Sequence, residues 1–206
     1  MSTDVLARLT FRPMTLADLD RVPLRCQGAR EEIAARIAAL GAAAILAFDG
    51  DRHVAQLQFR PYAPLVRSPT GIWDPLYWGD FGAGAPALPA NSLAVFCYHV
   101  GQLEDSDERV AAYQGHGIAT ALLDHLLAWA RDHGVPALIA KCTPSPYAVM
   151  SFMGGLSATR YLERGFTLES SWVEPQVLEV VRERGLVGPD EDAVAAATVG
   201  CCVKRF

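Results

Sequence analysis

Two glycines at the start of an amphipathic helix constrain this chain more than any other feature. An apolar run over 92–100 predicts a strand buried on both faces. Further along, Gln114-Gly115-His116-Gly117-Ile118-Ala119-Thr120 opens a helical pattern over 117–133, whose apolar stripe is Ile118, Leu122, Leu123, Leu126, Leu127 and Ala130. The glycines let a ligand approach the backbone, and the unpaired N–H groups of a helix start attract anions. This strand, turn and helix therefore predict an anion site, most naturally for a phosphate or pyrophosphate.

Two common phosphate-binding patterns do not fit this turn. A P-loop needs the spacing Gly-x-x-x-x-Gly-Lys-Ser/Thr, and the turn has neither that spacing nor the lysine. A dinucleotide-binding turn has a third small residue where this chain has Thr120, and an acidic residue at the end of the next strand. Here that strand ends in Lys141-Cys142, so both interpretations fail.

A third interpretation rests on two short motifs. The stretch 114–119 resembles the Gln/Arg-x-x-Gly-x-Gly/Ala motif of the GNAT superfamily of acyl-CoA-dependent N-acyltransferases. The stretch Tyr161-Leu162-Glu163-Arg164-Gly165-Phe166 resembles the later Tyr-x-x-x-Gly-Phe motif of the same superfamily. The order of predicted elements agrees with it along nearly the whole chain, beginning with Phe11-Arg12-Pro13-Met14-Thr15-Leu16-Ala17-Asp18-Leu19.

The resemblance implies a site for acetyl-CoA as co-substrate. It places the coenzyme contacts at Tyr98, Val100, Gln114, Gly115, His116, Gly117, Ile118, Ala119 and Thr120. In this scheme the backbone amides of the turn hold the pyrophosphate beside the Gln114 side chain, and the strand ending near Val100 contacts the pantetheine and the thioester. Tyr161 is the candidate catalytic acid, and the alternative is a tyrosine that only packs in the core.

Two features depart from the superfamily pattern. Many members carry an asparagine seven residues before the motif tyrosine, where this chain has Gly154. The segment 101–112 also lengthens the connection between the buried strand and the glycine turn, so the register between them is open.

The rest of the pattern predicts one α+β domain over 1–206, with a GNAT-like central mixed, mostly antiparallel sheet flanked by helices. Strands are expected over 6–12, 43–48, 53–62, 92–100, 137–142, 166–172 and 199–206. Besides the helix over 117–133, helices are expected from Thr15, over 29–40 and 157–164, and from Pro175. Asp49-Gly50-Asp51 predicts a hairpin turn. Inserts are expected at about 63–90, 101–112 and 174–197.

Composition limits the function classes. The net charge is −5 and no basic block is present, which argues against nucleic-acid binding. No apolar run approaches the roughly 18 residues of a membrane span, and the first residues carry no secretory pattern, so a cytoplasmic protein without membrane contact is expected. Five cysteines lie at 26, 97, 142, 201 and 202 without metal-ligand spacing, so we expect reduced cysteines and no metal.

Two functional hypotheses follow. The first is an N-acetyltransferase in which the primary amine of a small molecule, or another exposed amine, attacks acetyl-CoA directly. The alternative is a catalytically silent CoA-binding module for regulation or interaction. His99, on the buried strand, is a weak candidate for the general base, because a lone histidine there is more often structural. The aromatic segment with Trp73, Tyr77 and Trp78 is either a lid over the acceptor or a patch for homodimer formation.

Overall fold

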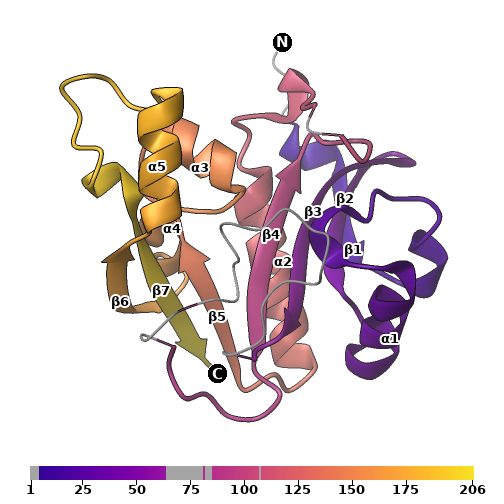
Figure 1. Cartoon of the computed structure of the whole chain (residues 1–206). Coiled ribbons are helices and arrows are strands. Elements are labelled where there is room, and N and C mark those ends of the chain that lie inside the picture. Colours follow the sequence, from indigo (N-terminus) through magenta and orange to yellow (C-terminus); the bar gives the residue numbers. More distant parts are fainter. Residues whose placement is uncertain (1–4, 64–80, 82–84, 107) are drawn as a thin grey trace. The chain divides into compact units, whose positions relative to one another are not determined.

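Seven strands and five α-helices make up the computed structural model, which describes residues 5–63, 81, 85–106 and 108–206 (Figure 1). Hydrogen bonds join the strands in the order β1-β2-β3-β4-β5-β7-β6. Contacts divide the chain into two compact units, the first comprising 1–60 and 96–134 and the second 61–95 and 135–206. The predicted α+β class, with a mixed and mostly antiparallel sheet flanked by helices, is confirmed.

The strands of the first unit are β1 (Leu9–Pro13), β2 (Ala44–Asp49), β3 (Arg52–Pro61) and the larger part of β4 (Leu93–Val100). The predicted hairpin joins β2 to β3, and Gly50 takes a φ of 61° in its turn. Strand β1 pairs antiparallel with β2 from Leu9 opposite Asp49 to Pro13 opposite Ile45. Because β2 ends at Asp49, the three residues before Leu9 have no strand partner there and form a 3-10 turn, η1 (Leu6–Arg8), instead of the predicted strand.

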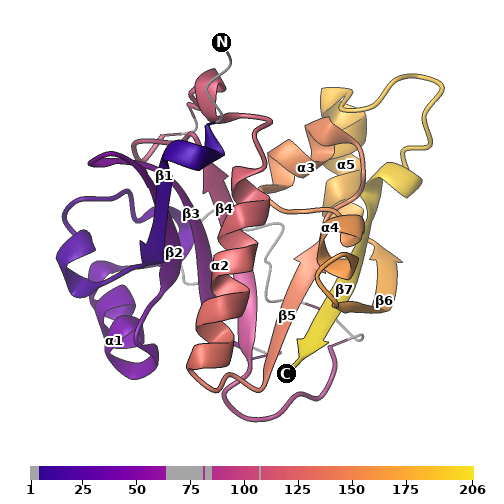
Figure 2. The ribbon, with the colours of Figure 1, turned by 180° about the vertical axis from the view of Figure 1, so that it is seen from behind.

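Two helices of this unit pack against its strands. Helix α1 (Arg30–Leu40) buries Ile33 and Ile37 in one cluster with Ala44, Leu46 and Phe48. Helix α2 (Ile118–Asp132), which lies in front of β4 in Figure 2, stacks His125 on Phe11 and packs Trp129 on Phe59. The helix expected from Thr15 is only a 3-10 turn, η2 (Leu16–Asp18), and a second such turn, η3 (Arg25–Gln27), precedes α1.

The second unit contains β5 (Ala137–Cys142), β6 (Thr167–Val173), β7 (Thr198–Arg205) and the first residues of β4. β4 and β5 pair in parallel, Leu93 opposite Leu138, whereas β7 pairs antiparallel with both β5 and β6. The helices are α3 (Tyr147–Met153), α4 (Ala158–Leu162) and α5 (Pro175–Arg184), with the 3-10 turn η6 (Ala195–Ala197) before β7. Phe81, Ala94, Ile139, Cys201 and Val203 form one of its buried apolar clusters.

The three predicted inserts differ in what the structure shows. The segment 101–112 is a loop ending in the 3-10 turn η5 (Ala111–Tyr113), and 174–197 contains α5 and η6. Most of 63–90, including Trp73, Tyr77 and Trp78, lies outside the described residues. No helix within the described ranges is both long and apolar enough to cross a membrane.

Candidate functional site

The glycine turn leaves its backbone open. Gly115 and Gly117 both have a φ of 76°, a left-handed conformation that residues with a Cβ rarely adopt. A Cβ added at Gly115 would meet no atom within 4 Å, and one at Gly117 would meet only Leu6 Cδ1, at 3.6 Å. Both glycines are therefore needed for the shape of the turn, while the space beside Gly115 stays clear for a ligand.

The N-terminus of α2 begins in this turn without a cap. Its first intrahelical hydrogen bond runs from Ala121 N to the Gly117 carbonyl at 3.0 Å, so the preceding N–H groups have no helical acceptor. No described side chain caps Gly117, and the first turn of the helix contains no acidic residue. Gly115, His116 and Gly117 are exposed, Ala119 and Thr120 are half-buried, and Ile118 is buried. The positive end of a 15-residue helix dipole is thus presented beside an open turn.

Hydrogen bonds fasten this turn to the end of β4. Gly101, directly after β4, donates from its N to the Val54 carbonyl at 2.8 Å and accepts from Val110 N at 2.8 Å. Gln114 Nε2 donates to the Val100 carbonyl at 2.7 Å. The lengthened connection is therefore closed at its base, because the chain leaves β4 at Gly101 and returns beside it at Val110. This closure settles the register that the sequence left open.

Gly101 is required for this closure. Its φ is 72°, and a Cβ at this position would lie 2.9 Å from both Gln114 Nε2 and the Val110 carbonyl oxygen. The Gln114 amide, which the resemblance places beside the pyrophosphate, donates to the Val100 carbonyl of β4 in the structure. Tyr113, just before the turn, is also tied to the end of β2, because its hydroxyl donates to Asp49 Oδ2 at 3.0 Å.

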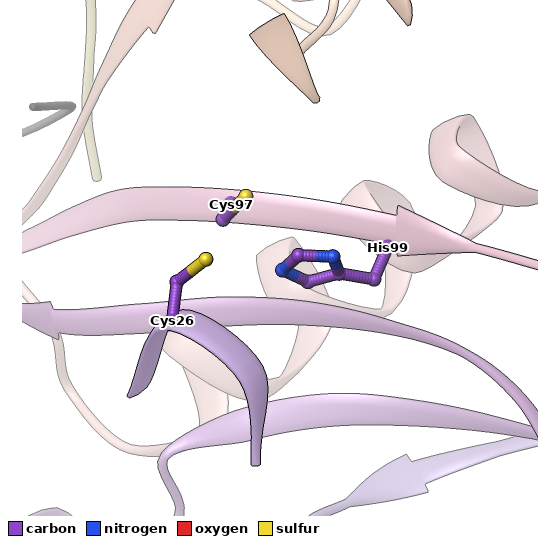
Figure 3. A group of neighbouring side chains, drawn as sticks. All are labelled: Cys26, Cys97 and His99. Carbon is purple, nitrogen blue, oxygen red and sulfur yellow. The ribbon is translucent and has the colours of Figure 1, made fainter. Parts of the chain in front are cut away.

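The buried strand β4 carries two more of the predicted residues. Tyr98 is 5% exposed and Val100 is half-buried. On the same strand, His99 Nδ1 lies 2.7 Å from Gln102 Oε1, and His99 Nε2 is buried without a hydrogen-bond partner among the described residues. Cys97 and Cys26 lie near that ring (Figure 3). This cluster could not be predicted from the sequence, because Cys26 is distant from the other two residues in the chain.

Tyr161 lies in the second unit and is 1% exposed. Its ring packs edge-on against Phe166, with ring centroids 5.1 Å apart. Its carbonyl accepts from Arg164 N at 3.0 Å and from Phe166 N at 3.2 Å, and Gly165 has a φ of 76° in the turn between them. Gly154, at the position of the superfamily's asparagine, ends α3 with a φ of 63°. Glycine there serves the backbone conformation.

A cleft of about 400 Å³ in the second unit was not predicted from the sequence. It is lined by β5, β6 and β7 together with the segments around α4 and η6, and it includes Thr143, Ser145, Leu168, Ser171 and Thr198. Thr143 Oγ1 is buried without a hydrogen-bond partner among the described residues. Small polar residues at strand ends resemble ordinary loop residues in sequence, so this cleft had no detectable signal.

Comparison with known proteins agrees with these features. Residues 110–153, which include the glycine turn and α2, match the acetyltransferase (GNAT) family. A solved GNAT-family acetyltransferase from Streptococcus pneumoniae is 13% identical, with a TM-score of 0.51 over 96% of this chain and 99% of its own. The protein assigned as arylalkylamine N-acetyltransferase 7 of the yellow fever mosquito Aedes aegypti is 11% identical, with a TM-score of 0.52 over 96% of this chain and 87% of its own. No curated protein sequence matches the chain significantly.

At such low sequence identity, the likeness to these solved structures establishes the fold alone. The match to the family includes the motif at 114–119. The chain therefore has the GNAT fold and carries a GNAT-family segment at 110–153, which confirms its resemblance to this superfamily.

Proposed function

We propose that the chain is an N-acetyltransferase that moves an acetyl group from acetyl-CoA to a primary amine of a small molecule, or to another exposed amine. The observation that carries the proposal is the open glycine turn at the uncapped N-terminus of α2, fastened to the end of β4. Such a helix start suits a pyrophosphate, because several N–H groups and the helix dipole favour the same negative charge. The turn therefore favours an anion without any lysine.

In this proposal the backbone amides of 115–120 hold the coenzyme pyrophosphate, and Gln114 positions the turn. Its amide already donates to Val100, so its part is to keep the turn against β4 rather than to carry the phosphate charge. The backbone of β4 near Tyr98 and Val100 contacts the pantetheine arm and the thioester. Because the Val100 carbonyl has a second lone pair, it remains able to accept one more hydrogen bond.

The proposed reaction is a direct attack. The amine nitrogen forms a bond to the thioester carbon, and the carbonyl oxygen becomes an oxyanion that a preorganised N–H stabilises by about 3 kcal/mol. The C–S bond then breaks, Tyr161 donates a proton to the departing thiolate, and the attacking nitrogen loses a proton to water, from which the tyrosinate takes one back. Positioning the two substrates together supplies most of the acceleration. With a net charge of −5, an amine acceptor suits the chain better than a nucleic acid.

Coenzyme binding is tested with two matched glycines. Gly115 and Gly134 are both exposed, have φ values of 76° and 64°, and have no atom within 4 Å of an added Cβ. Gly115→Ala and Gly134→Ala therefore impose a similar backbone strain without a clash. Calorimetry should show acetyl-CoA affinity at least about tenfold weaker for Gly115→Ala, a loss of about 1.4 kcal/mol, and unchanged for Gly134→Ala. Equal affinities in both variants would contradict the assignment of the turn.

Turnover is tested separately by thiol release from acetyl-CoA with a panel of primary amines. Release that depends on both the enzyme and the amine is expected. Acetyl-CoA binding without release with any amine of the panel would contradict the enzymatic proposal and favour the silent CoA-binding module.

A further inference from the structure

We propose that Cys26, Cys97 and His99 bind one Zn²⁺ ion. Sequence spacing alone predicted no metal site, because only Cys97 and His99 are neighbours in the chain. The fold brings the third residue to them. Cys97 and His99 are two residues apart on β4 and share one face of the strand, and Cys26 reaches that face from η3 (Figure 3). All three belong to the first unit.

The distances fit a tetrahedral zinc site. One ligand atom from each residue, the two sulfurs and a ring nitrogen, all lie within 4.8 Å of one another. In a tetrahedral site with normal zinc bond lengths, two sulfurs are about 3.8 Å apart, and a sulfur and a nitrogen about 3.6 Å apart. The cluster must therefore contract by at most about 1 Å, which small side-chain rotations achieve. Two sulfurs and an imidazole nitrogen are donors that zinc prefers over magnesium or calcium.

His99 is held in the orientation that a metal ligand needs. Its Nδ1 lies 2.7 Å from Gln102 Oε1, which fixes the ring and places the proton on Nδ1. The Nε2 lone pair then remains, buried and without a hydrogen-bond partner among the described residues. Figure 3 shows that side of the ring turned toward the two sulfurs. A disulfide between Cys26 and Cys97 would leave this buried nitrogen unsatisfied, whereas a zinc ion would satisfy it.

Arg60 holds the backbone of Cys26 in place. Its guanidinium lies 3.6 Å from the Phe96 ring centroid, and its Nη2 donates to the Cys26 carbonyl at 3.5 Å. Cys26 is only half-buried, which gives an ion a route of entry. Three protein ligands leave a fourth position for water or another ligand. Coordination uses the His99 lone pair, so His99 is not assigned as a general base.

The direct test is cobalt and zinc titration of the reduced, chelator-treated protein. Co²⁺ should give thiolate-to-cobalt charge-transfer absorption with one ion per chain, and Zn²⁺ should displace it. Cys26→Ser, Cys97→Ser and His99→Gln should lose at least about 100-fold in affinity. Gln102→Ala should lose about 10- to 100-fold, because it removes only the partner that orients His99. Cys142→Ser, a buried cysteine of the second unit, is the matched control and should bind normally.

A second measurement uses the unmodified chain and does not depend on the folding of any variant. Zn²⁺ should slow alkylation of Cys26 in the reduced protein, read by mass spectrometry of the peptide that contains it. The proposal is overturned if the reduced chain takes up no cobalt, if Cys26→Ser and Cys97→Ser both bind like the unmodified chain, or if zinc leaves Cys26 alkylation unchanged. None of these readouts involves the coenzyme, so they are independent of the proposed acetyltransferase activity.

Discussion

Gly101→Ala should loosen the attachment between the glycine turn and β4. The added Cβ would lie 2.9 Å from the Val110 carbonyl oxygen and from Gln114 Nε2, closer than real Cβ contacts come. The Val110 oxygen belongs to the backbone and yields little, whereas the Gln114 amide swings away by giving up its 2.7 Å hydrogen bond to Val100. The substitution therefore strains the backbone and breaks at least one of the bonds that close the connection.

The magnitude follows from these two effects. A residue with a Cβ at a φ of 72° costs about 1–2 kcal/mol, and each lost hydrogen bond costs about 1 kcal/mol. We expect Gly101→Ala to lower the free energy of unfolding by about 2–4 kcal/mol. Gly134→Ala carries the backbone strain without any contact and should cost about 1–2 kcal/mol. Gly101→Ala thus costs about 1–2 kcal/mol more than Gly134→Ala. If this difference is the cost of holding the turn in its binding position, acetyl-CoA binding weakens by about 5- to 30-fold.

The assays are urea unfolding and calorimetry on both variants, together with a double-mutant cycle. Gln114→Ala removes one of the two atoms that lie 2.9 Å from the added Cβ, so Gly101→Ala should cost about 1 kcal/mol less in that background. Strict additivity in the cycle, or a Gly101→Ala chain as stable as Gly134→Ala, would refute the argument that Gly101 and Gln114 act together.

Two further predictions concern Tyr161 and Asp18. Tyr161→Phe should lower kcat by about 100-fold, with acetyl-CoA affinity unchanged, when chemistry is rate-limiting. An unaltered kcat would return Tyr161 to a packing role. Burial raises the pKa of Asp18, but hydrogen bonds from Arg12 and Thr15 outweigh that effect and lower the pKa from 3.8 to about 2. The ionised Asp18 side chain therefore stabilises the fold fully above about pH 4, and this stabilisation is lost as the pH falls through about 2. This pKa shift corresponds to at most about 2.4 kcal/mol, and solvent reduces that value because the Arg12 side chain is 41% exposed. We therefore expect Asp18→Asn to lower the free energy of unfolding by about 1 kcal/mol at pH 7, measured by urea unfolding. Equal unfolding midpoints for the variant and the unmodified chain would refute this prediction.

Periodicity and turn chemistry predicted much of the fold. Strand β5 has the predicted bounds, because six consecutive buried residues bounded by Pro136 and Pro144 allow few alternatives. The hairpin followed from Asp49-Gly50-Asp51, and α2 from its apolar stripe. Helix α3 was missed, since Tyr147–Met153 is short and lacks a clear apolar period. Its boundaries were nevertheless marked by Pro146 before it and Gly154 after it.

The site was predictable where it is local and unpredictable where it depends on distant contacts. The glycine turn was found because its residues are consecutive. The closure of the connection to β4 was not found, because the need for glycine at 101 comes from Val110 and Gln114. Only the folded chain brings these residues close to Gly101. The same holds for Cys26 and the β4 residues beside it. Cys97 and His99 alone are typical of a buried strand and Cys26 of a half-buried turn, and only their proximity supports the proposed zinc site.

The second motif shows why a sequence match does not by itself assign catalysis. Packing explains each residue type in it: the Tyr161 ring lies against Phe166, and Gly165 takes a φ of 76° where an added Cβ would lie 2.9 Å from Lys204 Nζ. Lys204 Nζ in turn donates to the Arg164 carbonyl at 2.8 Å, which fixes the turn onto β7. A protein that used this turn only for folding would therefore favour a similar motif, with an aromatic residue at 161 and glycine at 165. Phenylalanine at 161 would keep the ring contact and lack only the hydroxyl. Measuring both kcat and the free energy of unfolding of Tyr161→Phe therefore separates a catalytic role of the hydroxyl from a structural one.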